Sequence, residues 1–287
     1  MPEVETIRTG LARLLPGRRV AKVDFDWPKG FPNAPSDVRR FLIGAKITGV
    51  RRRAKVLLIE LSSDYSLVIH LKMTGQLVFR GKTERFGAGH PSDSLVGDLP
   101  DKSTRVTLDF QDGSQLFFND QRKFGWMRLV PTSQVMDLDF FKKIGPEPLS
   151  PDFTADVLEA RLQRRSNSGI KAVLMDQSVL AGVGNIYADE SLWGAKIHPA
   201  TLVKNLKSAQ IRTLHKELLD ILRFAIAKGG STDKNYVDAH GKKGSYLQFA
   251  RVFRREGQPC PRCGTTIVKI RVAGRGTHIC PHCQKLT

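Results

Sequence analysis

Hydrophobic residues recur with helical spacing at the start of the chain, and farther along they form short, strand-like runs. Four of them fall on one face of a helix expected over residues 2–16, which Pro16 ends: Val4, Ile7, Leu11 and Leu14. β-Branched and aromatic runs then predict strands at residues 66–73, 105–110 and 115–120. Asp112-Gly113, between the last two runs, is typical of a hairpin turn. The first half therefore predicts one helix that leads into a mostly antiparallel sandwich or barrel, with a long surface loop over 79–103.

The pattern changes from strands to helices near the middle of the chain. The segment I-G-P-E-P-L-S-P (144–151) predicts a linker, because its three prolines stiffen the chain and prevent a helix. Helical periodicity follows at residues 154–164, 170–176 and 208–228. The longest of these helices has a serine at its start and Gly229-Gly230 after its end. We expect separate sheet and helical parts on the two sides of the linker.

The charge of the chain adds a polyanionic partner to this picture. The 287 residues contain 46 Lys and Arg against 28 Asp and Glu, a formal net charge of +18. Residues 231–287 are the most basic part, with 11 Lys and Arg against 3 Asp and Glu, yet they also contain aromatic residues and all four cysteines. The net charge predicts a nucleic acid as the partner, or less readily an anionic membrane surface. The aromatic residues and cysteines of 231–287 indicate that this segment is not simply a solvated basic tail. No apolar run approaches the ~18 residues that span a bilayer, and the start lacks a signal-peptide pattern, so we expect an intracellular protein.

The four cysteines have the spacing of a metal site. Cys260 and Cys263 form one C-x-x-C pair, and Cys280 and Cys283 form a second pair after sixteen intervening residues. Two such pairs at this separation are typical of a tetrahedral thiolate site for one structural zinc ion. Two disulfides or a redox dithiol are the alternatives, and an intracellular chain with no other cysteine disfavours them. Between the pairs, residues 267–279 predict a hairpin with Gly274-Arg275-Gly276 at its tip, from which an arginine could reach a phosphate.

Two other short motifs each allow a structural and a binding interpretation. Gly182 and Gly184 permit close backbone approach, and Asn185 begins a helix whose free N–H groups could face an anion. Taken alone, this motif favours a tight turn between helices, whereas beside the basic four-cysteine segment it favours a phosphate-binding site. Met73 and Phe124 follow predicted strands and could be core residues. Beside Arg122, however, they are the apolar shapes that can insert into a base stack from which a nucleotide has been extruded.

The opening residues M-P-E-V-E-T also allow two interpretations. Proline and acidic residues suit the first turn of a helix, so Pro2 and Glu3 could have only a structural role. If Met1 is removed, Pro2 instead becomes a secondary amine beside a carboxylate. Such an amine can attack an electrophilic carbon and form an iminium ion.

Together these residues resemble the bacterial formamidopyrimidine-DNA glycosylase family, which excises oxidised purines, over nearly the whole chain. The motifs of the family stand here in order as P-E-V-E-T (2–6), R-R-A-K (52–55), H-L-K-M-T-G (70–75), D-Q-R-K-F-G (120–125), G-P-E-P-L-S (145–150), G-V-G-N-I-Y-A-D-E (182–190), G-G-S-T (229–232) and the four-cysteine segment. The resemblance implies an α+β protein of the helix-two-turn-helix class of DNA glycosylases.

The resemblance also implies a domain organisation. We expect an N-terminal catalytic β-sandwich domain with a leading helix at residues 1–143 and an interdomain linker at 144–151. A helical, helix-two-turn-helix DNA-binding domain is expected at 152–230. A lesion-capping loop and a C-terminal four-cysteine zinc-finger hairpin are expected at 231–287.

The same resemblance implies roles for individual residues. Pro2 would be the nucleophile at the sugar C1′, Glu3 would transfer protons, and Lys55 would contact the backbone near the lesion and assist excision. Base loss and strand scission by β,δ-elimination would then share one active site. Among the DNA-binding residues, Met73, Arg122 and Phe124 would fill the space left by the flipped base, with Arg122 meeting the orphaned cytosine. Kinked phosphates would be held by three more residues: Lys171, Asn185 and Arg275. Lys123 stands where the family usually has a second arginine.

The chain departs from the family at its start. Family members usually begin M-P-E-L-P-E-V-E-T, whereas this chain is three residues shorter. If Val4, Ile7 and Leu11 set the helix register, Pro2 takes the place of the inner proline. Three residues span ~4.5 Å as helix, and productive geometry tolerates an error of about 1 Å. A lesion- or abasic-site-binding protein with impaired catalysis therefore stays open as an alternative.

A second alternative is an endonuclease VIII-type glycosylase for oxidised pyrimidines, which V-E-T and the set Met73, Arg122 and Phe124 disfavour. In the favoured interpretation the partner is damaged double-stranded DNA and the cofactor is one structural Zn²⁺ per chain. We further expect a monomer without membrane contact, in the bacterial cytoplasm and associated with the nucleoid through DNA.

Overall fold

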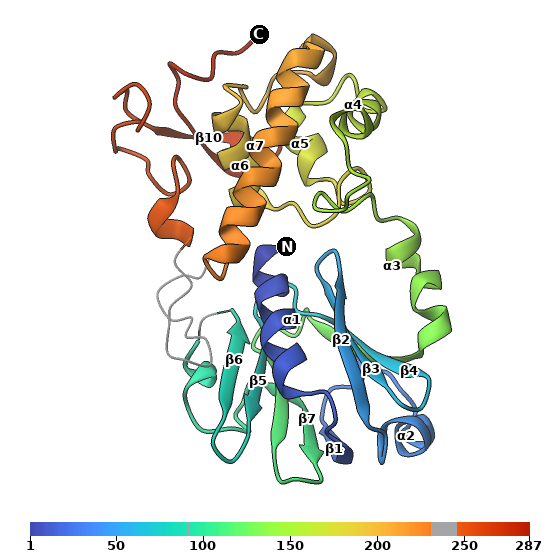
Figure 1. Ribbon diagram of the computed structural model, residues 1–287. Helices are drawn as coiled ribbons and strands as arrows, with labels where there is room; N and C mark the ends of the chain where they lie inside the picture. Colours follow the sequence, from blue (N-terminus) through green and yellow to red (C-terminus); the bar gives the residue numbers. More distant parts are fainter. Residues whose placement is uncertain (91, 231–245) are drawn as a thin grey trace. The chain divides into compact units, whose positions relative to one another are not determined.

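The computed structural model describes residues 1–90, 92–230 and 246–287 (Figure 1). The described residues form two compact units. The sheet unit contains residues 2–142 and 228–230, and the helical unit contains Met1 and residues 143–227 and 246–287. None of the helices in these ranges is long and apolar enough to cross a membrane.

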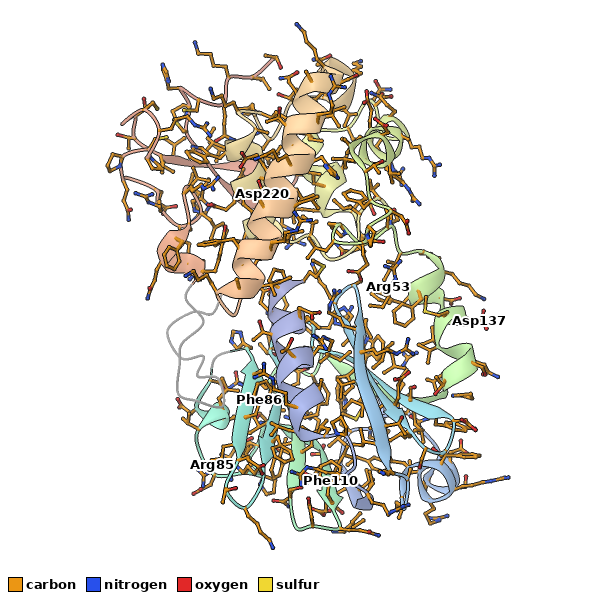
Figure 2. All side chains as sticks on the ribbon, in the orientation of Figure 1. Arg53, Arg85, Phe86, Phe110, Asp137 and Asp220 are labelled. Atoms are coloured by element: carbon orange, nitrogen blue, oxygen red, sulfur yellow. The ribbon has the colours of Figure 1, made fainter. Side chains whose placement is uncertain are left out.

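Two antiparallel sheets form the centre of the sheet unit. The larger sheet has the strand order β1-β7-β8-β5-β6, and the smaller has the order β2-β3-β4-β9. The strand bounds are β1 (Val20–Phe25), β2 (Ile47–Arg53), β3 (Val56–Leu61), β4 (Tyr65–His70), β5 (Gly75–Arg80), β6 (Arg85–Gly89), β7 (Thr104–Phe110), β8 (Gln115–Asp120) and β9 (Trp126–Pro131). Apolar side chains from both sheets form one continuous core, to which the labelled Phe86 and Phe110 belong (Figure 2). The prediction of a β-sandwich is confirmed.

The leading helix packs on this core. Helix α1 (Pro2–Leu14) buries Val4, Ile7 and Leu11, as its spacing predicts. The fourth predicted core position was wrong by one residue, because Leu15, just after the helix, is fully buried and Leu14 is only partly buried. A Cβ atom on Gly10 would lie 2.1 Å from the ring of Phe86, so the absence of a side chain lets the helix approach strand β6.

The prediction of a long surface loop over 79–103 was wrong in part. Strand β5 continues through Arg80, and β6 pairs with it along five residue pairs. Alternate burial of Phe86 and Ala88 gives β6 its inner face. Its composition, R-F-G-A-G, hides this alternation because glycine occupies the outward positions. The remaining short helices of this unit are α2 (Pro35–Asp37), η1 (Val38–Leu42), η2 (Asp93–Leu95), η3 (Thr132–Asp137) and α3 (Asp139–Lys142).

The helical unit has its own apolar core, which α7 (Ser208–Ala227) lines with one buried face. The other helices are α4 (Ala155–Gln163), α5 (Ile170–Met175), α6 (Asn185–Gly194), η4 (Val203–Asn205) and η5 (Tyr246–Phe249). The Thr154 side chain accepts a hydrogen bond from the Val157 N–H and caps α4. A hairpin of β10 (Val268–Val272) and β11 (Arg275–Ile279) follows. The expected helices and hairpin are therefore present.

The hairpin turn lies one residue earlier than predicted. Ala273 and Gly274 both have positive φ angles, of 48° and 73°, which is typical of a two-residue turn that matches the strand twist. Arg275 is therefore the first residue of β11 rather than the centre of the tip. It remains exposed there.

Candidate functional site

Three connections meet at one end of the sandwich because of the strand register. Val56 pairs with His70, His70 pairs with Trp126, and Gly75 pairs with Asp120. These pairs bring together the β2–β3 turn, the β4–β5 loop and the β8–β9 loop. Each connection contains residues that the sequence singled out.

Met73, Arg122 and Phe124 form a compact exposed group, called the loop cluster below. The Met73 side chain is 64% exposed and the Phe124 side chain 54% exposed. The Arg122 guanidinium lies between them: its Nη1 is 3.7 Å from the Met73 sulfur, and its central carbon is 4.7 Å from the centre of the Phe124 ring. The structure thus brings together two loops that are 49 residues apart and leaves their large apolar side chains in water.

A buried carboxylate holds both loops of this cluster. The side chain of Asp120 is fully buried and accepts the N–H groups of Arg122, at 3.3 Å, and Gly125, at 2.6 Å. Thr74, in the other loop, donates its hydroxyl to the same carboxylate and accepts the Arg122 N–H at 3.2 Å. Gly125 leaves little room for a side chain, since a Cβ there would lie 3.0 Å from the Asp120 carboxylate. Asp120 therefore fixes the backbone at Arg122 from the protein interior.

Lys55 lies in the tight turn between β2 and β3. Ala54 has a positive φ of 53°, and its carbonyl accepts a hydrogen bond from Arg52 at 2.9 Å. Arg52 also donates to Glu5 of α1 at 2.8 Å, so the leading helix supports this turn. Burial raises the pKa of Glu5, but hydrogen bonds and charge from Arg52 and Arg8 outweigh burial and leave the pKa below its ordinary value.

His70 lies at the end of β4, and its side chain is buried. Burial, with the charges of Lys72 and Lys55, lowers its pKa to about 3. Its Nδ1 accepts the Lys72 N–H at 3.0 Å, so the ring stabilises the left-handed backbone at Lys72, whose φ is 51°. The imidazole is therefore neutral at physiological pH.

Pro2 is buried at the first position of α1, and Glu3 is partly buried beside Gly230. Met1 belongs to the helical unit, where its side chain is 2% exposed and its amino nitrogen donates to the Gly182 carbonyl at 3.0 Å. Because Met1 precedes it, the Pro2 nitrogen is part of a peptide bond. A free amine at position 2 requires removal of Met1.

The helical unit brings together a second group, called the hairpin cluster below: Lys171, Asn185, Asp189 and Arg275. Asn185 Nδ2 donates to the Gly276 carbonyl at 3.0 Å, and Lys171 Nζ lies 3.3 Å from the same oxygen. Lys171 is fully buried, whereas Arg275 is exposed. A pocket of about 330 Å³ lies beside Asn185 and Gly276 and is also lined by Arg254, Lys269 and His278.

The four cysteines converge on one point and have the geometry of a metal centre. Their sulfur atoms lie within 4.8 Å of one another, and Cys263 is 3.5 Å from both Cys280 and Cys283. A tetrahedral ion with ~2.3 Å bonds to sulfur separates its ligands by about 3.8 Å, so the four thiols fit such an ion. Burial raises the pKa of Cys260, but hydrogen bonds from the Arg262 and Cys263 backbone leave it below its ordinary value. These donors favour the Cys260 thiolate, whereas burial raises the pKa of Cys280 to about 12 and also raises the pKa of Cys283.

Arg262 fixes the first pair of cysteines to α6. Its guanidinium donates to the carbonyls of Trp193 and Gly194 at 3.0 and 3.2 Å and lies 3.9 Å from the centre of the Trp193 ring. These carbonyls are at the carboxyl end of the helix, where a cation is favourable. No local sequence pattern predicts this contact, because Trp193 and Arg262 are 69 residues apart.

Comparisons with known proteins agree with this architecture. Family models match residues 1–127 as the formamidopyrimidine-DNA glycosylase N-terminal domain, 144–236 as its H2TH domain, and 257–286 as the zinc finger found in FPG and IleRS. The formamidopyrimidine-DNA glycosylase of Pediococcus pentosaceus is 42% identical over 286 residues, which cover 100% of this chain and 98% of that protein. The chain belongs to the formamidopyrimidine-DNA glycosylase family.

Other relatives extend the match to structure. The formamidopyrimidine-DNA glycosylase of Chloroflexus aurantiacus is 41% identical, with 99% of this chain and 96% of that protein covered. A Lactococcus lactis FPG mutant in complex with a Fapy-dG-containing DNA has a TM-score of 0.87 at 35% identity and covers 99% of each chain. The Lactococcus lactis enzyme bound non-covalently to DNA containing an AP site has a TM-score of 0.85 at 35% identity, with 99% of this chain and 98% of that chain covered. The resemblance stated from the sequence is therefore confirmed.

The site residues expected from the family thus fall into several groups. The structure places Met73, Arg122 and Phe124 together, and it places Lys171, Asn185 and Arg275 around one hairpin. The expected lesion-capping loop at 231–245 lies outside the described residues. The roles of Pro2, Glu3 and Lys55 stay predictions.

Sequence reasoning missed two buried carboxylates that organise these groups, Asp120 and Asp189. Asp120 stands inside the family motif D-Q-R-K-F-G, directly after a strand, and this position was the available signal. Asp189 stands in G-V-G-N-I-Y-A-D-E, on a helix that is buried along most of its length. A charged residue within such a helix indicates a buried partner.

Proposed function

We propose that this chain is a DNA-repair glycosylase and AP lyase that excises oxidised purines, such as 8-oxoguanine and formamidopyrimidines, from duplex DNA. The observation that carries this proposal is the loop cluster in a member of this family. Solved relatives were crystallised with DNA containing Fapy-dG or an abasic site, which supports damaged DNA as the substrate. The bacterial relatives support action on nucleoid DNA in the cytoplasm.

The loop cluster has the chemistry needed to occupy a gap in a base stack. Met73 is flexible and polarisable, Phe124 is planar, and both are exposed in the free protein. Insertion between bases would remove their apolar surface from water and would fill the place of an extruded nucleotide. Arg122, held between them, would donate to the edge of the base left without a partner.

The hairpin cluster and the metal centre would hold the sugar-phosphate backbone. Arg275 and Asn185 offer a charged and a neutral donor close to the Gly276 backbone. We propose that one zinc ion binds the four cysteines of each chain. It would have only a structural role, because four sulfurs complete its coordination shell. The protein would act as a monomer.

The proposed chemistry begins at the amine of Pro2 after Met1 has been removed. An unperturbed α-amine has a pKa of about 8, so part of it is unprotonated at neutral pH. Its lone pair attacks the sugar C1′, the bond from C1′ to the base breaks, and the base leaves with the bonding electrons and a proton. Glu3 protonates the sugar ring oxygen as the ring opens and an iminium forms.

Strand scission follows from the acidity of protons near the iminium. Loss of a C2′ proton expels the 3′ phosphate, and subsequent loss of the C4′ proton expels the 5′ phosphate. Glu3 would relay these protons, and Lys55 would contact the backbone beside the lesion. Water finally hydrolyses the link between the sugar remnant and Pro2.

A binding protein without catalytic activity is the second candidate, and the environment of Met1 favours it. The Met1 side chain is buried, and its amino group donates to Gly182. The three residues used to set the register of α1 are also buried. With Met1 retained, the chain would grip a lesion and form no covalent intermediate.

Borohydride trapping on an abasic duplex separates the two candidates. An intact mass spectrum first establishes whether Met1 is present in the purified protein. A covalent adduct at Pro2, located by peptide mapping, supports the lyase. Tight binding without an adduct, together with an adduct after the amino terminus is lengthened to M-P-E-L-P-E-V-E-T, supports the binding protein. Faster excision of an oxidised pyrimidine than of 8-oxoguanine would instead favour the endonuclease VIII type.

A further inference from the structure

A fully buried carboxylate on α6 connects this helix to α5 and to the hairpin. Asp189 is 0% exposed, and its Oδ1 lies 2.6 Å from Nζ of Lys171 on α5. Its other oxygen accepts the backbone N–H of His278 on β11 at 3.0 Å. A buried charge is tolerated only when it is paired and hydrogen-bonded, so Asp189 fixes the distance between these three elements.

The ammonium group of Lys171 is also directed into the protein. Besides Asp189, it has two partners in the hairpin: the Thr277 hydroxyl at 2.6 Å and the Gly276 carbonyl at 3.3 Å. The contacts with Thr277 and Gly276 are hydrogen bonds, and the contact with Asp189 is an ion pair. Burial lowers the pKa of Lys171, and the charge of Asp189 opposes this shift. A side chain that is 0% exposed and has these partners would have to leave the interior to reach a phosphate.

The three residues that follow Arg275, namely Gly276, Thr277 and His278, therefore each have a hydrogen bond to α5 or α6. Gly276 accepts from Asn185 as well as Lys171, and Thr277 donates its hydroxyl to the Arg275 carbonyl at 3.0 Å. Arg275 itself is exposed at the first position of β11. Its backbone is thus fixed by the hairpin cluster, while its guanidinium remains accessible.

We propose that Asp189 and Lys171 are positioning residues for DNA binding: their buried ion pair sets the hairpin so that Arg275 meets a phosphate, and Lys171 does not touch DNA. This inference rests on the proposed function, because it assumes that Arg275 binds a phosphate. It departs from the role that the family resemblance gives Lys171. A hairpin fixed before binding avoids the cost of ordering it in the complex, which increases affinity.

The test measures the affinity of full-length, zinc-loaded variants for a duplex with a tetrahydrofuran abasic analogue. Asp189→Asn keeps the shape and removes the charge, and we expect about tenfold weaker binding, the size of one lost charge-assisted hydrogen bond. In an Arg275→Ala background the same change should alter affinity less than twofold, because it acts through Arg275. Asp220→Asn, in an exposed pair with Lys216 on α7, is the matched control and should leave affinity unchanged (Figure 2).

A paired replacement distinguishes positioning by Lys171 from direct contact. Lys171→Met leaves a buried carboxylate without its cation and should weaken binding. In the Arg275→Ala background Lys171→Met should alter affinity less than twofold, because a positioning residue acts through Arg275. If Lys171 instead binds a phosphate, Lys171→Met weakens binding equally in both backgrounds.

Zinc content and a thermal melt check that each variant is folded. If Asp189→Asn does not fold, Thr277→Val removes one hairpin acceptor and keeps the ion pair, and it should weaken binding several-fold. Unchanged affinity in the folded variant, or an equal loss of affinity from Asp189→Asn or Lys171→Met in the Arg275→Ala background, would overturn the inference. Failure of the wild-type protein to bind the duplex would instead refute the proposed function.

Discussion

The loop cluster and the hairpin cluster both depend on a buried aspartate, but the two aspartates have different partners. Asp120 accepts hydrogen bonds from neutral groups, namely two backbone N–H groups and the Thr74 hydroxyl. Asp189 faces a cation, Lys171, that is itself buried. In the first case the functional side chains remain in water, whereas in the second one of the expected phosphate ligands lies inside the protein.

This difference indicates how each cluster can fail. Loss of Asp120 frees the backbone of two loops, because its bonds are to the chain itself. Loss of Asp189 leaves an unpaired cation in the interior, which is the costlier defect. The exposed members of the loop cluster should by contrast be replaceable without loss of stability.

Removal of the metal should have the largest effect, and it should be confined to the helical unit. Cys260→Ala, or chelation of the wild type, removes a ligand set whose metal-binding free energy is of order 10 kcal/mol in zinc-finger peptides. We expect loss of DNA binding while the sheet unit stays folded. Binding assays with near-ultraviolet and far-ultraviolet circular dichroism measure both. Undiminished binding after zinc loss would contradict this prediction, and restored binding on zinc addition is the control.

The loop cluster should matter for lesions and not for folding. Phe124→Ala should lower affinity for an abasic duplex about tenfold to a hundredfold, because stacking of a base on an aromatic ring is worth ~1–3 kcal/mol. Met73→Ala should also lower this affinity, through the loss of buried apolar contact. The free energy of unfolding should change by less than about 0.5 kcal/mol. Met136→Ala, at another exposed methionine of the sheet unit, is the control and should leave lesion binding unchanged. A large loss of stability with normal binding would refute the assignment.

Asp120→Asn should affect folding and lesion binding together. An asparagine keeps one acceptor oxygen and presents an NH₂ to a donor, so one backbone N–H loses its partner. We expect a loss of about 1–3 kcal/mol in the free energy of unfolding, with weaker lesion binding because Arg122 is no longer fixed. Urea titration and the abasic-duplex assay provide the measurements. Asp137→Asn, an exposed residue on η3, should change neither quantity (Figure 2).

Acid should act in opposite directions on the two units. The pKa of His70 is about 3 in the sheet unit and 6.5 as its ordinary value. Between these values the unfolded chain binds more protons, so the stability of the sheet unit falls as pH decreases, by up to ~1.4 kcal/mol per pH unit. His70→Asn keeps an acceptor for the Lys72 N–H and should flatten this dependence. An unchanged pH profile of urea unfolding in this variant would show that other groups dominate.

In the helical unit, Glu190 gives the opposite pH dependence of stability. Burial raises its pKa above the ordinary 4.5, although hydrogen bonds from the backbone of residues 251–253 oppose this shift. Just above pH 4.5 the folded form therefore holds more protons, and its stability increases as pH falls through that window. Glu190→Gln should remove this gain, measured by the same urea titrations.

Features set by local chain geometry could be predicted from the sequence. Each C-x-x-C pair places two sulfurs on one turn, so the cysteine spacing was enough to predict the metal centre. The strand runs at 66–73 and 115–120 placed Met73 and Phe124 at or just after strand ends. The helix register followed from Val4, Ile7 and Leu11, which are spaced for one face.

Features set by distant contacts could not be predicted. Lys171 and Thr277 are 106 residues apart in sequence, and no local pattern indicates that they touch. Strand β6 was not predicted, because glycines at its outward positions leave no polar and apolar alternation in the sequence. Its pairing with β5 defines it as a strand. The burial of Leu15 instead of Leu14 also depends on distant contacts, because α1 ends at Leu14 and the side chain of the next residue packs into the core.

The exposed thioether of Met73 makes the protein sensitive to the kind of stress that damages its proposed substrate. Peroxide converts an accessible methionine to its sulfoxide, which is polar and carries a hydrated oxygen. Such a side chain is poorly suited to slide between stacked bases. Reductive repair of this one residue would then set how long lesion recognition persists in an oxidised cell.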